Sequence, residues 1–164
     1  MKRMVLLVVA ALGMAALGTA AAQAQTKGTA DISQQLNRLG LKFKLTASGN
    51  YSITYDLDGG RSQVAYIMGK TQKVGSAEIR ELWSRAGTVD SVPTEEEMQT
   101  LLEESGSASM GFWSIEESDD GGYTVYFSVK VPVYLNDSDL AALLEYTASS
   151  ADQKEEELFS ADDE

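Results

Sequence analysis

Acidic side chains are the most numerous groups in this sequence that could take part in catalysis. A glycosidase needs two carboxylates at a set separation, one acting as an acid and the other as a base or nucleophile. Neighbouring glutamates on a helix or strand point in different directions, so a run of them is not such a pair. We therefore expect no enzymatic activity and no catalytic residue. The runs are Glu95-Glu96-Glu97, Glu103-Glu104, Glu116-Glu117 and Glu155-Glu156-Glu157.

Histidine and cysteine are both absent from the sequence. This removes the commonest general base and the commonest transition-metal ligand, and it excludes histidine-dependent serine hydrolases, disulfides and thiol chemistry. Asp56 and Asp58 with Gly59 resemble the start of a calcium loop, but Gly60 stands where the next oxygen ligand is needed. We interpret this segment as a turn, and expect neither a metal nor a cofactor.

Four aromatic residues are the candidates for a binding surface: Trp83, Phe112, Trp113 and Tyr126. Tyr126 falls on the non-core side of its predicted strand, and Trp83 competes with Leu82 for the inside of another. Exposed aromatic side chains on a sheet are typical of peptide-binding and dimer surfaces. The alternative is that helices cover this face and that these aromatic side chains belong to the core.

A hairpin organises the second half of the chain. Its strands are predicted over Met110–Glu116 and Tyr123–Val131, joined by a turn at Asp119-Asp120-Gly121-Gly122. Pro132 cannot donate a hydrogen bond to a sheet and should end the second strand. The core face of that strand is predicted from its alternation to carry Tyr123, Val125, Phe127, Val129 and Val131.

A long amphipathic helix is predicted after the hairpin and should lie on the sheet. Asn136, Asp137, Ser138 and Asp139 can cap its first turn. Its apolar positions recur at helical spacing. They are Leu140, Leu143, Leu144, Thr147, Ala148 and Ala151, with Leu158 and Phe159 as a last apolar anchor.

Two shorter helices are predicted from their end signals. Asp31 can cap the first, which should end at Gly40. Thr94 and Glu97 form a capping box for the second, which should end at Gly106. The residues predicted to face the core are Ile32, Leu36 and Leu39 in the first helix, and Met98, Leu101 and Leu102 in the second.

Strands are predicted between these two helices. Alternating apolar residues indicate a meander of antiparallel strands separated by glycine turns. Ala77–Ala86 is ambiguous, because its apolar residues fit a helical face as well as a strand. The predicted strands are Tyr51–Leu57 and Ser62–Gly69, with a short extra one allowed at Phe43, and Lys70–Gly75 is predicted to be a loop.

The N-terminal segment has the pattern of a secretory signal. Lys2 and Arg3 precede an apolar run, and small residues lead to Ala22-Gln23-Ala24. Residues 1–24 are therefore predicted to be removed after Ala24, which makes the mature protein periplasmic or secreted without a stable membrane anchor. An uncleaved membrane anchor is the alternative. Residues 25–159 should form one domain, and residues 160–164 a disordered acidic tail.

Charge is divided unevenly along the chain. Residues 25–86 carry nine basic and five acidic side chains, whereas residues 87–164 carry two basic and twenty acidic ones. The two halves should attract each other. Nucleic acids and anionic membrane surfaces need clustered lysine and arginine, so neither is expected as a partner. A basic partner is compatible with this surface.

Three segments resemble the YbjN-like family of bacterial proteins: residues 58–64, 78–84 and 151–158. The family fold is similar to that of type III secretion chaperones, and its members are described as sensory transduction regulators. The resemblance implies that Ala77–Ala86 is a strand. It then implies an α+β fold with an antiparallel five-stranded sheet and three helices, in the order α-β-β-β-α-β-β-α.

The resemblance also shapes the expected function. Chaperones of similar fold work as dimers that bind an extended stretch of another polypeptide, although they act in the cytoplasm. Our first hypothesis is a noncatalytic exported binding or regulatory module that binds a polypeptide partner or forms a homodimer. The second is an acidic sensor of cations or of a small ligand, and an enzyme is a distant third.

Overall fold

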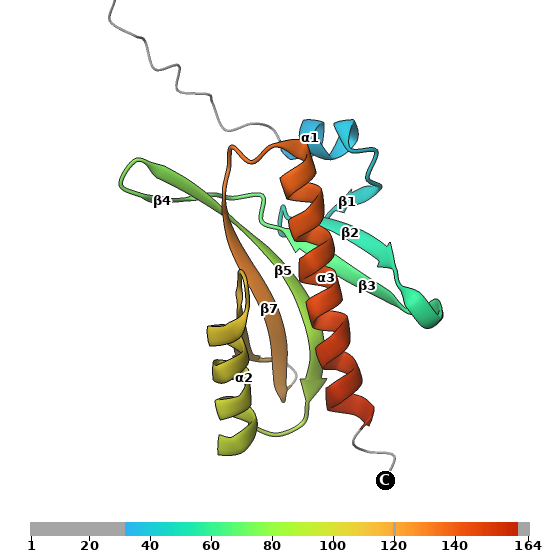
Figure 1. Cartoon of the computed structure of the whole chain (residues 1–164), viewed down its shortest axis with the longest axis vertical. Coiled ribbons are helices and arrows are strands. Elements are labelled where there is room, and N and C mark those ends of the chain that lie inside the picture. Colours follow the sequence, from blue (N-terminus) through green and yellow to red (C-terminus); the bar gives the residue numbers. More distant parts are fainter. Residues whose placement is uncertain (1–31, 120, 161–164) are drawn as a thin grey trace, which may run out of the picture.

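The computed structural model describes residues 32–119 and 121–160, and it has an α+β fold with three α-helices and one antiparallel sheet (Figure 1). The fold class predicted from the sequence is confirmed. The elements in chain order are α1 (Ile32–Arg38), β1 (Phe43–Leu45), β2 (Tyr51–Asp56), the short 3-10 helix η1 (Asp58–Gly60), β3 (Ser62–Ile67), β4 (Gln72–Val74), β5 (Ala77–Val89), α2 (Glu95–Ser107), β6 (Phe112–Glu117), β7 (Tyr123–Pro132) and α3 (Asp137–Ser160).

The sheet has seven strands where five were predicted. Its order is β1-β2-β3-β5-β7-β6, and β4 pairs with the first residues of β5. The prediction of a loop over Lys70–Gly75 is wrong, because Gln72–Val74 pairs with Ala77–Ile79 around Gly75, whose φ is +60°. All three residues of β4 are exposed, so the strand leaves no alternation of apolar and polar residues in the sequence.

The ambiguous segment Ala77–Ala86 is a strand, and β5 continues beyond it to Val89. Its pairing with β3 and β7 places Leu82 and Ala86 on the core side and Trp83 on the other side. Apolar residues on both faces of one strand give the spacing that also fits a helix. The resemblance to a family decided this point correctly where periodicity could not.

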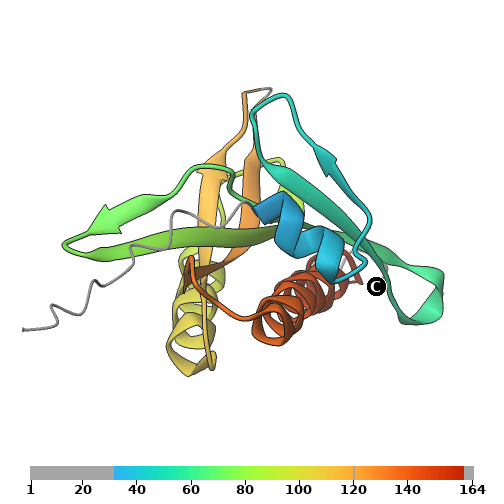
Figure 2. The same cartoon turned by 90° about the horizontal axis from the view of Figure 1, so that it is seen from above.

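The helices cover one face of the sheet, which we call the helical face (Figures 1 and 2). α2 and α3 lie on this same side, and α1 lies beside the N-terminal end of α3. Arg38 of α1 is bound there to Asp137, with 2.8 Å between Nη2 and Oδ1. The fully buried residues at this interface include Leu36, Ile53, Ala65, Ile67, Leu82, Val129, Leu144, Ala148 and Ala151.

Several predicted helix and strand ends are confirmed, whereas α2 continues through Gly106, its predicted end, to Ser107. Thr94 and Glu97 form the capping box of α2, β7 ends at Pro132, and Asn136 Oδ1 accepts the Asp139 amide at 2.8 Å. The predicted apolar stripe of α2 is correct only in part. Of its residues only Leu101 is buried, and Leu102 is 72% exposed. The predicted signal, the Asp31 cap and residues 161–164 of the predicted tail lie outside the described residues. None of the described helices is both long and apolar enough to cross a membrane.

The phenol of Tyr55 should make stability depend on alkaline pH. Burial, with a smaller contribution from Glu145, raises the pKa of Tyr55 to about 12, and its hydroxyl has no hydrogen-bond partner among the described residues. An unfolded tyrosine has a pKa of about 10, so this group's contribution to stability is complete below about pH 10 and is lost as the pH rises towards about 12.

We therefore expect Tyr55→Phe to lose less stability than the wild type between about pH 9 and about pH 11.5. At neutral pH the two should agree within about 1 kcal/mol, since the hydroxyl makes no bond to lose. Urea unfolding at each pH measures this, and parallel losses in the two proteins would contradict it.

Candidate binding surface

The four aromatic residues predicted to form one surface lie on two faces of the sheet. Trp83, Phe112 and Tyr126 lie on the face away from the helices, which we call the open face, and no helix of the described part of the chain covers it. Trp113 lies on the helical face, where its ring centroid is 4.9 Å from that of Phe127. The grouping of Phe112 with Trp113 is therefore wrong, because successive residues of a strand point to opposite faces.

An aromatic row crosses the open face from β3 to β7. The rings of Tyr66 and Trp83 are stacked, with centroids 3.9 Å apart and planes 9° apart. The ring of Tyr126 meets Trp83 nearly at right angles, with centroids 5.4 Å apart. All three side chains are half-buried, so they support one another and still meet solvent. We call Tyr66, Trp83 and Tyr126 the aromatic row.

Tyr66 was missed as a site residue. The alternation of its strand places it on a face with Val64 and Met68, but it does not say which strand is the neighbour. The register of β3 against β5, in which Tyr66 is opposite Trp83, brings the two rings together. Phe112 lies one strand further on, in β6, and the Lys130 ammonium is 5.3 Å from the centre of its ring.

A shallow cleft of about 280 Å³ opens beside the aromatic row, and we call it the open-face cleft. Its chemistry is mixed, with an indole, a phenol, two carboxylates, two serine hydroxyls and one thioether. Such a lining can hold an apolar group and orient a polar one. The residues are Met68, Glu81, Trp83, Ser114, Glu116, Tyr126 and Ser128.

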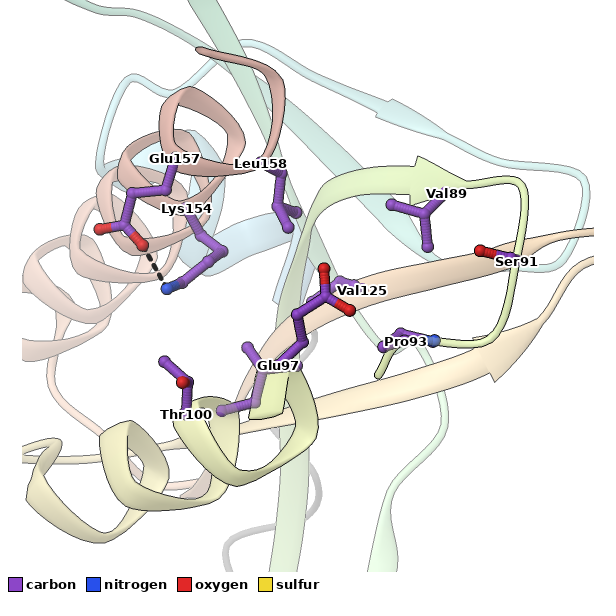
Figure 3. Close-up of a pocket in the computed structure, with 10 residues that line it drawn as sticks. Val89, Ser91, Pro93, Glu97, Thr100, Val125, Lys154, Glu157 and Leu158 are labelled. Carbon is purple, nitrogen blue, oxygen red and sulfur yellow. Dashed lines mark hydrogen bonds and ion pairs between the residues drawn. The ribbon is translucent and has the colours of Figure 1, made fainter. Parts of the chain in front are cut away.

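A second cleft, of about 250 Å³, lies between the end of β5, α2 and the C-terminal part of α3 (Figure 3). Lys154 is buried at its edge, where its ammonium donates to Glu104 Oε1 at 2.6 Å and also to Glu157. Burial alone would lower the pKa of Lys154, but these two bonds outweigh burial and raise it. The lysine therefore serves as a charged link between α3 and α2.

Several of the glutamates considered for catalysis have structural partners instead. Glu97 completes the capping box of α2, and hydrogen bonds from Thr94 lower the pKa of its carboxyl group. Glu104 and Glu157 bind Lys154, and Glu156 forms an ion pair with Arg61. Over residues 32–119 and 121–160, no group of three or more acidic side chains is arranged to hold a metal ion.

Comparison with known proteins gives a likeness of fold. No family model matches the sequence, and no curated protein does. Among solved structures, the crystal structure of YbjN from E. coli, described as a proposed transcription regulator, is similar to this chain. The sequences are 9% identical, the match covers 82% of this chain and 93% of that one, and the TM-score is 0.47.

Proposed function

We propose that this protein is a noncatalytic binding module, chaperone-like or regulatory, that holds a segment of another polypeptide on its open face. The observation that supports this is the aromatic row, left uncovered by the helices and bordered by the open-face cleft. Aromatic side chains are enriched at the centres of protein interfaces, because each buries a large area at a low entropic cost.

The face of the sheet suits this role better than its β6 edge. An added strand would need the outward amides of β6, but the amide of Trp113 already donates to Ser105 Oγ of α2 at 2.8 Å. The start of this edge is therefore occupied by a group of the protein itself. Binding on the face of the sheet does not require free backbone amides of β6.

Export is part of the same proposal. The signal-like pattern of residues 1–24 supports a periplasmic or secreted protein of residues 25–164. The partner would then be an exported or membrane-facing polypeptide, or a second copy of this chain. A small-ligand sensor is the second candidate, supported by the cleft between α2 and α3.

Peptide binding should depend on the aromatic row. Random peptides of about twelve residues are selected on the immobilised protein, and the affinities of the selected peptides are then measured in solution. Trp83→Ala and Tyr126→Ala should each weaken binding by about tenfold or more, which is typical of interface hot spots. Cooperative urea unfolding of each variant confirms that it remains folded.

Trp113→Phe is the matched control, because Trp113 lies on the helical face. It should leave the affinity within about twofold of the wild type. It also leaves Trp83 as the sole tryptophan, so that its fluorescence reports binding on the open face. Affinities that are unchanged in both alanine variants would reject the surface.

A further inference from the structure

Two carboxylates border the open-face cleft from different strands. Glu81 is on β5 and Glu116 is on β6, with Tyr126 and Ser128 of β7 between them. In the described part of the chain, no basic nitrogen lies within 4.0 Å of either carboxylate. This differs from Glu104, Glu156 and Glu157, which are all in ion pairs. The two carboxylates of the cleft are therefore not neutralised by an ion pair within the described part of the chain.

Lys70 and Lys130 line a small pocket that shares Met68 and Glu81 with the cleft, and neither lysine forms an ion pair with Glu81 in the described part of the chain. Lys130 is directly opposite Glu81 in the register of β5 and β7, yet its ammonium lies over the ring of Phe112. Arg85 is exposed on the same face of β5, but Trp83 separates it from Glu81 along the strand. A cation entering the cleft from outside would meet Glu81 without displacing an ion pair.

The other walls of the cleft also suit a cation. The rings of Trp83 and Tyr126 are 89° apart and form a corner, and a cation over an aromatic face is attracted by the ring's quadrupole. Ser128 lines the cleft, is 3% exposed and makes no side-chain hydrogen bond to any described residue. Its hydroxyl oxygen can accept from an N–H group.

Resting on the proposed function, we propose that the open-face cleft receives an arginine side chain from the bound polypeptide segment. A guanidinium is planar, stacks on aromatic rings and presents donors in several directions, so it can meet two carboxylates and a hydroxyl together. A volume of about 280 Å³ accommodates such a group. The formal net charge of −12 also favours a basic partner segment.

The test uses the peptides selected on the wild-type protein. Arginine should be enriched among them, and replacing it with citrulline, which has the same shape and no charge, should weaken binding by about tenfold. The double variant Glu81→Gln/Glu116→Gln should bind the arginine-containing peptide more weakly than the wild type by a similar factor. Citrulline should cause no further loss in that variant, because the two changes remove the same interaction.

Glu95→Gln/Glu96→Gln is the control, since it changes the net charge equally at two exposed positions of α2. It should leave the affinity unchanged. Equal losses in the two double variants would mean a general effect of charge and would overturn the arginine site. Peptides whose binding needs Trp83 but neither arginine nor the two glutamates would also overturn it, and would leave the proposed function standing.

Two further outcomes would overturn the arginine site for other reasons. If no selected peptide depends on Trp83, the proposed function fails together with the arginine site. If sedimentation shows a dimer that Glu81→Gln/Glu116→Gln abolishes, and no peptide competes with it, the cleft belongs to a second copy of this chain.

Discussion

Phe127→Ala should lower the free energy of unfolding by about 3–5 kcal/mol. Phe127 is 2% exposed on the helical face of β7, where its ring contacts Trp113 and also Tyr146, whose ring centroid is 5.5 Å away. Truncation would leave a cavity between the sheet and α3, and the lost contacts add to the loss of buried apolar area. Urea unfolding with a fixed m-value measures the change.

Tyr126→Ala is the matched control, one residue earlier on the same strand and on the open face. Its half-buried ring contacts Trp83, so the loss of this aromatic pair should lower the free energy of unfolding by about 0.5–1.5 kcal/mol. No cavity should form in the core. Phe127 is thus expected to matter for stability and Tyr126 for binding. Equal destabilisation by the two substitutions would contradict the assignment of faces.

Gly111→Ala should destabilise the protein by at least about 2 kcal/mol. The φ angle of Gly111 is +101°, a conformation that is strained for any residue with a Cβ atom. A Cβ atom would also lie 2.7 Å from the carbonyl oxygen of Ser128 and 2.8 Å from Cζ of Phe127. Because Gly111 leads into β6, the strain would also shift a wall of the open-face cleft.

Gly106→Ala provides the comparison for this substitution. Gly106 is in α2, and a Cβ atom there would meet nothing within 4 Å. Alanine should therefore raise helix stability by up to about 1 kcal/mol. Thermal or urea unfolding of both variants tests the pair, and a Gly111→Ala protein as stable as the wild type would show that β6 does not approach β7 as described.

The sequence was most informative where its signals were local. The alternation of β7, the capping box at Thr94 and Glu97, and Pro132 at the strand end each depend on residues a few positions apart. β4 could not be predicted, because three exposed residues leave no pattern of burial. Both faces of β5 carry apolar residues, so its periodicity favoured neither a helix nor a strand.

The site was predictable only in part. Trp83, Phe112 and Tyr126 were named from residue type and alternation, and the same rule, applied to adjacent residues, would have separated Trp113 from Phe112. Tyr66, Glu81 and Ser128 join the site through the register of β5 with β3 and β7. Glu116 joins it through the pairing of β6 with β7. Register between distant segments depends on tertiary packing, which no short pattern records.

Whether a partner polypeptide binds on the open face is tested most directly by photo-crosslinking in the cell from which the sequence comes. A benzophenone amino acid is introduced in place of Met68, which lines the open-face cleft, or in place of Tyr134, which is 71% exposed between β7 and α3. Adducts are identified by mass spectrometry. We predict that position 68 captures a reproducible polypeptide and that position 134 does not. Equal capture at both positions, or capture from position 134 alone, would contradict a partner on the open face.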